Sequence, residues 1–186
     1  TTENGVTTYG VKKGSYVASV TTADGAETEY VTLAAAVAAA KDGDTVKLLG
    51  DVTLGATLKV TKTLTLDLNG KTITNEKDLW NEDNDTWSLI SVRKNGNLTI
   101  NDTSAEKTGA LRAKKNDCYA LDVYDQTSRL TVNAGTYVGN ISAIYAFVGK
   151  VTINGGHFSI QQLSSSNDYR FMLNCYDASH TAGTAG

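Results

Sequence analysis

The sequence predicts an all-β fold in which short strands stack in repeating turns of the chain. Four segments share the pattern apolar, polar, apolar, Asn, and each runs into a corner: Leu66–Asn69, Leu98–Asn101, Leu130–Asn133 and Val151–Asn154. Their asparagines are 32, 32 and 21 residues apart. A strand-and-corner unit of this length cannot bury its apolar face alone, so it must stack on the next unit.

Two further sets of segments supply the other strands of each turn. One set lies upstream of the repeats: Ile90–Val92, Leu121–Val123, Ile144–Ala146 and Leu173–Cys175. The other follows each Asn: Thr72–Ile73, Ala110–Leu111, Thr136–Tyr137 and His157–Phe158. Three strands per turn of about twenty residues plus loops are typical of a right-handed parallel β-helix. We therefore predict that fold, with residues 103–108 as a polar loop inserted in one turn.

The repeated asparagines mark the corners of the turns. Asn tolerates left-handed backbone, and its side-chain amide can satisfy backbone groups at a bend. Stacked side chains of this kind can also hydrogen-bond to one another along the stack. We predict such a ladder, with independent turn asparagines as the alternative, for Asn69, Asn101, Asn133 and Asn154.

Residues 1–43 are predicted to form an N-terminal hairpin and a short helix that pack on the β-helix of residues 44–186. Residues 15–20 and 27–31 flank a turn ending at Gly25, which is typical of a β-hairpin. Thr32 is a good N-cap for an alanine-rich run, Lys41 suits the C-terminal dipole, and Gly43 suits the C′ position. We therefore expect a helix over 33–41 that covers the first turn.

After the helix, residues 46–48 and 52–54 are expected to begin the β-helix, whose last turn before residue 186 is incomplete. An open turn exposes unpaired strand and apolar surface. We expect either that the native chain continues or that another subunit, such as a second copy, covers that end. The N-terminus has no charged and apolar signal region, so we expect a mature or excised piece.

The run from Glu29 to Leu49, followed by Leu66 to Ile73, resembles the pectate-lyase-like right-handed β-helix domains of bacterial surface and secreted proteins, many from gut bacteria. Similar domains occur in bacteriophage tail and surface proteins. The resemblance covers the chain from about Tyr16 to its end. It implies an extracellular or cell-surface module for adhesion, glycan recognition or rigid spacing. The alternative that it implies is a polysaccharide lyase or glycoside hydrolase, because fold does not settle function.

The composition of the chain limits the classes of partner that it can bind. The formal charge is −3 and no basic cluster is present, so the chain lacks the electrostatic footprint of nucleic-acid binding. No run approaches the ~20 apolar residues of a membrane span. The two cysteines, Cys118 and Cys175, fall two turns apart, about 10 Å, which exceeds the ~5.5 Å Cα spacing of a disulfide. We expect two free thiols and a polysaccharide or protein partner.

Catalytic residues are not evident. Hydrolysis of a glycosidic bond needs two carboxyl groups about 5 to 9.5 Å apart. The aspartates of the strands, Asp67, Asp122 and Asp125, are scattered. The outward column that contains Asp122 has only one carboxylate and reads Ser91, Asp122, Tyr145, Asn174. His157 is expected to be a surface imidazole without metal partners. The sequence therefore favours a non-catalytic module.

The best metal candidate is the acidic loop with Asp78, Glu82, Asp83 and Asp85. Calcium takes six to eight oxygen ligands, and carboxylates supply them. The loop lacks the Gly and the terminal Glu of an EF-hand, and exposed acidic loops are usually only solvated. Calcium is thus the one cofactor that the sequence suggests, with a solvated loop as the alternative.

A binding surface has better support. A second outward column reads Arg93, Tyr124, Phe147, Tyr176, and Tyr145 stands one position away. Such a row can stack against sugar rings or bury against another chain, or it can simply stabilise the sheet. Trp80 and Trp87 of the acidic loop are a second candidate, unless they fold back to seal the loop. We predict a glycan or partner site among these residues.

Overall fold

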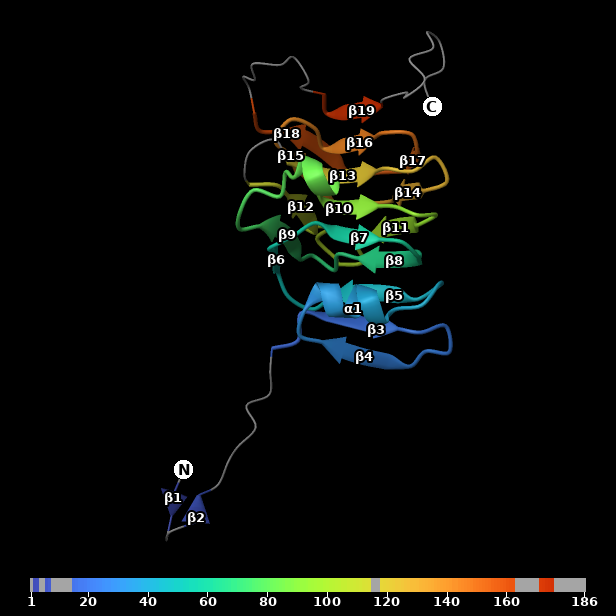
Figure 1. The fold of residues 1–186 in the computed structure, drawn as a ribbon. Coiled ribbons are helices and arrows are strands. Elements are labelled where there is room, and N and C mark those ends of the chain that lie inside the picture. Colours follow the sequence, from blue (N-terminus) through green and yellow to red (C-terminus); the bar gives the residue numbers. More distant parts are fainter. Residues whose placement is uncertain (1, 4–5, 8–14, 115–117, 163–170, 176–186) are drawn as a thin grey trace.

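The computed structural model describes residues 2–3, 6–7, 15–114, 118–162 and 171–175, and within them it is an all-β fold with parallel sheets and a single α-helix (Figure 1). One sheet, the front sheet, consists of β7 (Leu58–Val60), β10 (Ser88–Val92), β13 (Tyr119–Val123), β16 (Ile144–Ala146) and β19 (Leu173–Cys175). A second contains β4 (Glu27–Tyr30), β3 (Ala18–Thr21), β5 (Thr45–Leu48), β8 (Thr63–Asp67), β11 (Asn97–Asn101), β14 (Arg129–Val132) and β17 (Lys150–Ile153). A third contains β6 (Val52–Leu54), β9 (Thr72–Asn75), β12 (Ala110–Arg112), β15 (Thr136–Gly139) and β18 (His157–Ile160). Two further strands, β1 (Thr2–Glu3) and β2 (Val6–Thr7), pair with each other in antiparallel fashion.

From β7 onward the chain visits the three sheets in a fixed order. A strand of the front sheet is followed by one of the second sheet and then by one of the third, as in β7, β8 and β9, and the order then repeats. Neighbouring strands within each sheet therefore come from successive passes and are parallel. Leu121 lies opposite Ile90 and Ile144, and Leu111 lies opposite Ile73 and Tyr137. The predicted register of these two strand sets is confirmed.

The space between the sheets is filled by apolar side chains that alternate along the strands with outward polar ones. Leu98, Ile100, Leu111, Leu121 and Leu130 belong to one continuous buried cluster that runs along the stack. Burying each such side chain contributes roughly 1.5–3 kcal/mol relative to leaving it in water. The repeated apolar columns of the sequence therefore form one elongated core.

The N-terminal hairpin extends the second sheet. β3 pairs with β4 on one side and with β5 on the other, antiparallel in both cases, so the predicted hairpin is confirmed. The helix α1 (Leu33–Ala39) follows, and the Thr32 hydroxyl caps it by accepting a hydrogen bond from the Ala35 N–H at 3.1 Å. Leu33 and Ala36 are its buried residues.

The helix ends before Lys41, so its predicted range of 33–41 is too long. Ala40 already has extended backbone, with φ −58° and ψ 147°. The last carbonyl groups are satisfied by Lys62, whose ammonium donates to the carbonyl oxygens of Ala38 at 2.8 Å and Ala40 at 2.6 Å. This side chain fixes the end of the helix because helix C-termini favour a positive charge.

Three of the four repeated asparagines form a chain of hydrogen bonds. The Asn133 amide donates to Asn101, and the Asn154 amide donates to Asn133, both at 2.7 Å. Asn69 does not join them, contrary to the prediction, because Asp67 is the residue opposite Asn101. Asn69 instead adopts left-handed backbone, with φ 46°, and donates to the Leu48 carbonyl at 2.8 Å. It is an independent turn residue.

The loop of residues 103–108 is organised by the buried Asp102. Its carboxylate accepts hydrogen bonds from the Gly70 N–H at 2.8 Å, the Ser104 hydroxyl at 2.7 Å and the Gly109 N–H at 2.7 Å. Desolvation opposes ionisation of Asp102, but these hydrogen bonds outweigh it and lower its pKa. One carboxylate thus holds both ends of the loop against the preceding pass.

Candidate functional site

The segment of residues 76–87, hereafter the Trp loop, connects β9 to β10 and folds over the outer surface of the front sheet. Its tip is the 3₁₀ turn η1 (Glu82–Asn84), which Asn81 caps by accepting a hydrogen bond from the Asn84 N–H at 3.1 Å. A bridge between Asn81 and Thr86 closes the base of this tip. The loop therefore presents its two tryptophans from a defined turn.

Six aromatic rings join the Trp loop to the sheet in a closed circuit. From ring to ring, the centroid distances are 6.1 Å, 5.6 Å, 5.4 Å, 6.0 Å, 5.1 Å and 5.6 Å around the order Trp80, Trp87, Tyr124, Phe147, Tyr145, Tyr119 and back to Trp80. Tyr119 is buried and the other five rings are partly exposed. Contacts at these distances contribute beyond the buried area alone. We call these six residues the aromatic circuit.

The aromatic circuit contains residues from both candidate binding sites of the sequence analysis, the outward column and the tryptophans of the loop. Tyr124 and Phe147 are stacked as predicted for the outward column, and Tyr145 lies beside Phe147. The tryptophans fold back onto these rings. Tyr176 lies outside the described residues. Tyr119 was not predicted, because it has the same strand parity as the inward Leu121 and no sequence signal places it with the outward rings.

Arg93 anchors the Trp loop and is not offered to a ligand. It is 8% exposed, and its guanidinium carbon lies 4.3 Å from the ring centroid of Tyr124 and 5.9 Å from that of Trp87. Its Nε donates to the Ser91 hydroxyl at 2.5 Å, and another of its nitrogens donates to the Asp85 carbonyl. Arg93 thus connects the sheet to the loop through both hydrogen bonds and cation–π contact.

Asp122 lies in the predicted outward column, but the side chain is fully buried. It accepts hydrogen bonds from the hydroxyls of Ser88 and Ser91. Desolvation raises its pKa to about 6, against the opposing effects of these serines, Arg93 and Lys59. The expectation that this column faces solvent is therefore wrong for Ser91 and Asp122. A bound polysaccharide cannot reach this carboxylate in the observed conformation.

The four carboxylates suggested as calcium ligands do not converge. Asp78 accepts a hydrogen bond from the Trp80 N–H at 2.9 Å, and Glu82 accepts one from the Trp80 indole at 3.4 Å. Asp85 hydrogen-bonds to the Tyr124 hydroxyl. The pKa of Tyr124 is raised mainly by desolvation and, to a lesser extent, by the Asp85 carboxylate. Within the described residues, no three His, Cys, Asp or Glu side chains form a group suited to a metal ion. The acids, Asp83 excepted, are engaged within the loop and its support. His157 is exposed on β18.

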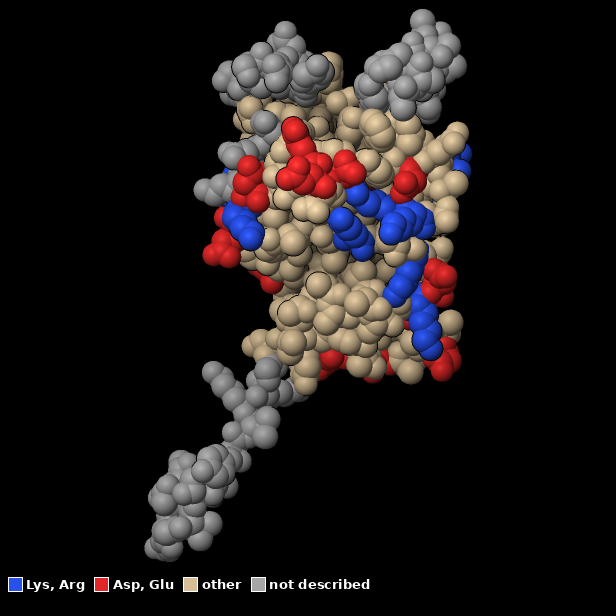
Figure 2. Space-filling model, viewed as in Figure 1, with Lys and Arg blue, Asp and Glu red and all other residues tan. Residues whose placement is uncertain are grey.

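A polar pocket of about 370 Å³ opens beside the circuit, between the Trp loop and β7. Its wall includes one aromatic ring and a mixture of charged and amide groups: Trp80, Lys59, Lys77, Asp78, Asn81 and Asn84. On the face seen in Figure 2, acidic side chains gather near the level of β13, with basic side chains beside and below them. An aromatic wall combined with several hydrogen-bonding groups is typical of small-ligand sites.

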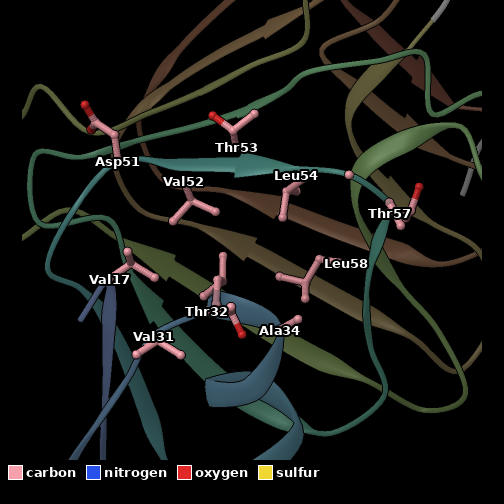
Figure 3. A pocket seen from close by; sticks show the side chains of 13 residues that line it. Val17, Val31, Thr32, Ala34, Asp51, Val52, Thr53, Leu54, Thr57 and Leu58 are labelled. Atoms are coloured by element: carbon pink, nitrogen blue, oxygen red, sulfur yellow. The ribbon is translucent and has the colours of Figure 1, made fainter. Parts of the chain in front are cut away.

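A second pocket of about 370 Å³ has different chemistry. It lies between α1 and the β6–β7 corner, where Val52, Leu54 and Leu58 point into it and Asp51 and Thr53 point away (Figure 3). Its lining is mainly apolar, and Val31 at its rim is 57% exposed. It offers few groups that could recognise a polar ligand.

The remaining predictions concern cysteines and membranes. Cys118 and Cys175 are both free, as expected, and they are respectively buried and exposed. Within the described residues, no helix combines the length and the apolar character that crossing a membrane requires. Comparison with known proteins gave no match to any family model, curated protein or solved structure.

Proposed function

We propose that the three sheets form a right-handed parallel β-helix over residues 44–186, on which the hairpin and the helix of the N-terminal part, residues 1–43, pack. The cyclic order of the strands supports this proposal, because each sheet gains one parallel strand per pass. Connections between parallel strands of one sheet are right-handed in about 98% of cases. Each pass then contacts mainly its neighbours, as in other repeat architectures.

On this body, we propose that the Trp loop and the front sheet form a glycan-recognition site of a non-catalytic, extracellular or cell-surface module. The single observation that carries the proposal is the aromatic circuit with a polar pocket beside Trp80. Partly exposed rings present flat apolar surface to sugar rings, and neighbouring polar groups can bind hydroxyls. Because the rings are fixed by one another, binding costs little ordering entropy.

In this proposal Trp80 is central, because it belongs to both the circuit and the pocket. A sugar ring that stacks on its indole lies within reach of Asn81, Asn84 and Lys59 from the pocket wall. Amides and ammonium groups are suitable donors to sugar hydroxyls, and the amides are also acceptors.

The alternative is a polysaccharide lyase or glycoside hydrolase. Its support is the number of carboxylates in the Trp loop, from Asp78 to Asp85. Against it, Asp122 is buried, and the loop carboxylates Asp78 and Glu82 make hydrogen bonds to Trp80. A third alternative is a rigid spacer, or an oligomer, in which the circuit only stabilises the stack.

The test is a glycan array probed with the purified chain, once with calcium and once with a chelator, with the same polysaccharides assayed for cleavage. We expect binding without cleavage. Trp80→Ala is expected to weaken binding at least about tenfold, as removal of a central aromatic anchor does. Tyr16→Ala is the matched control, because it removes an aromatic ring outside the circuit. Cleavage would favour the enzyme, and loss of binding only with chelator would restore a calcium site. Absence of both activities would favour the spacer.

A further inference from the structure

A buried chain of polar groups connects the interior of the front sheet to the Trp loop. Asp122 accepts a hydrogen bond from Ser91 at 2.5 Å, the Ser91 hydroxyl accepts one from Arg93 at 2.5 Å, and Arg93 donates to the carbonyl oxygen of Asp85. Asp85 belongs to the Trp loop, two residues before Trp87. All three residues on the sheet side are buried. These hydrogen bonds therefore connect the Asp122 carboxylate to the Trp loop.

We propose that Asp122, acting through Ser91 and Arg93, is the anchor of the Trp loop, and that protonation of Asp122 in mildly acidic solution releases the loop. This inference rests on the proposed function in one respect only, because the released loop carries Trp80 of the glycan site. Asp122 is a positioning residue and touches no ligand.

The physical reason is the burial of Arg93. A buried guanidinium is tolerated when an opposite charge and hydrogen-bond acceptors surround it, and it is costly when the counter-charge is removed. When Asp122 becomes neutral, Arg93 keeps the carbonyl of Asp85, the Ser91 hydroxyl and the ring faces, but it loses its interaction with the buried negative charge of Asp122. The free energy of the protein is then lower when the guanidinium of Arg93 moves into water. That movement breaks the contacts of Arg93 with Asp85 and Trp87.

Other charged groups around Asp122 do not replace this role. Lys59 on β7 supplies a positive charge, and the neighbour in the next strand is the uncharged Tyr145. Cys118 is close, but desolvation, together with Asp78 and Asp122, raises the pKa of its thiol to about 12, so it stays neutral. Desolvation places the pKa of Asp122 at about 6, within the range of mildly acidic solution. On the loop side, Asp85 carries a carboxylate that hydrogen-bonds to the Tyr124 hydroxyl.

The chain supplies its own probe, because its two tryptophans are both in the Trp loop. We would titrate the full chain from about pH 7.5 to about pH 4.5 and measure tryptophan emission and acrylamide quenching. The wild type is expected to show a transition near pH 6, with the quenching constant rising about twofold as the indoles become exposed. The melting temperature should not fall over this range. The reason is that the pKa of Asp122 is higher in the folded state than its unfolded value of 3.8. Protonation of Asp122 therefore stabilises the folded state fully below pH 3.8, and this stabilisation is lost as the pH rises through about 6.

Single substitutions test whether Asp122 is the group whose protonation releases the loop. Asp122→Asn removes the charge permanently, so its tryptophans should be exposed at every pH and show no transition. Asp125→Asn is the matched control, because it removes a carboxylate three positions away and should keep the wild-type transition. If Asp122→Asn does not fold, Arg93→Met serves instead, with the same expected loss of pH dependence.

The proposal is overturned if the transition survives in Asp122→Asn or Arg93→Met. It is also overturned if tryptophan exposure rises only together with a falling melting temperature, since that is acid unfolding. None of these measurements uses a glycan. If the pH transition is seen but the array detects no glycan binding, the proposed function is refuted and the role of Asp122 stands. If glycan binding is seen but the pH transition is absent, the role of Asp122 is refuted and the proposed function stands.

Discussion

The ring of Trp87 lies against the ring of Tyr124, with their centroids 5.6 Å apart, and this contact joins the Trp loop to the end of β13. Arg93 contacts the faces of both rings. The pair is therefore one direct contact between the loop and the sheet, and its energy can be measured.

A double-mutant cycle between Trp87→Ala and Tyr124→Ala is expected to give a coupling energy of about 0.5–1.5 kcal/mol, as for other aromatic pairs in contact. The free energies of unfolding come from denaturant titration. Trp87→Ala combined with Tyr16→Ala is the control cycle, and its effects should add, because Tyr16 lies outside the circuit. Additivity in the first cycle would show that the observed ring contact carries no energy.

The asparagine chain predicts unequal effects for residues with the same sequence pattern. Asn133→Ala removes the hydrogen bonds to both Asn101 and Asn154 and should lower the free energy of unfolding by about 1–2 kcal/mol. Asn154→Ala removes one of them and should cost about half as much. Asn69→Gly should be close to neutral, because the loss of its bond to Leu48 is offset by the better fit of Gly to φ 46°. Equal losses at all three positions would contradict the observed register.

Asp102 should stabilise the fold in a pH-dependent way. Asp102→Asn removes an acceptor from buried donors, including the Gly109 N–H, and should cost about 2–4 kcal/mol at neutral pH. Because hydrogen bonds lower the folded-state pKa, the contribution of Asp102 is present above the unfolded value of 3.8 and is lost as pH falls through the folded-state pKa. The difference in melting temperature between wild type and variant should therefore shrink in strong acid. A constant difference would mean that the ionised form is not the stabilising one.

The two thiols should differ in reactivity. Cys175 is exposed, whereas Cys118 is buried and has a pKa raised to about 12, chiefly by desolvation. Since the thiolate is the nucleophile, the native chain should react with a disulfide reagent at one thiol and the denatured chain at two. Cys175→Ser should make the native chain unreactive. Reaction of native Cys175→Ser would place Cys118 in contact with solvent.

Much of the strand arrangement could be predicted because apolar columns must align from pass to pass. Leu121 and Leu111 occupy the positions that alternation assigns to them. The alternation has a period of two, however, and Leu64, Leu66 and Leu68 satisfy it in two registers. The observed register pairs Leu64 with Leu98, so Asp67 takes the corner position that the sequence assigned to Asn69.

Most residues of the candidate site, Tyr119 excepted, could be predicted from the sequence, but their burial could not. Alternation places Asp122 and Tyr145 on the outer surface of the front sheet, and it contains no information on how the Trp loop folds back. Burial of Asp122 beneath that loop depends on the contacts of Arg93 with Ser91 and Asp85. Asp85 belongs to a loop with no strand periodicity, so the alternation of the strands does not predict its contact with Arg93. For the same reason, Trp80 and Tyr119 could not be brought together from the sequence.

The ammonium of Lys62 has a bearing on the order of folding. It closes the end of a seven-residue helix, yet it lies beyond β5, β6 and β7 in the chain. Helices shorter than about 12–15 residues are marginal in water by themselves. The helix α1 should therefore remain unformed while synthesis has reached only residue 54, and it should become stable once the strand that follows Lys62 has been added. A helix that precedes the parallel β-strands of the three stacked sheets in the chain would then form only after the first of those strands are in place.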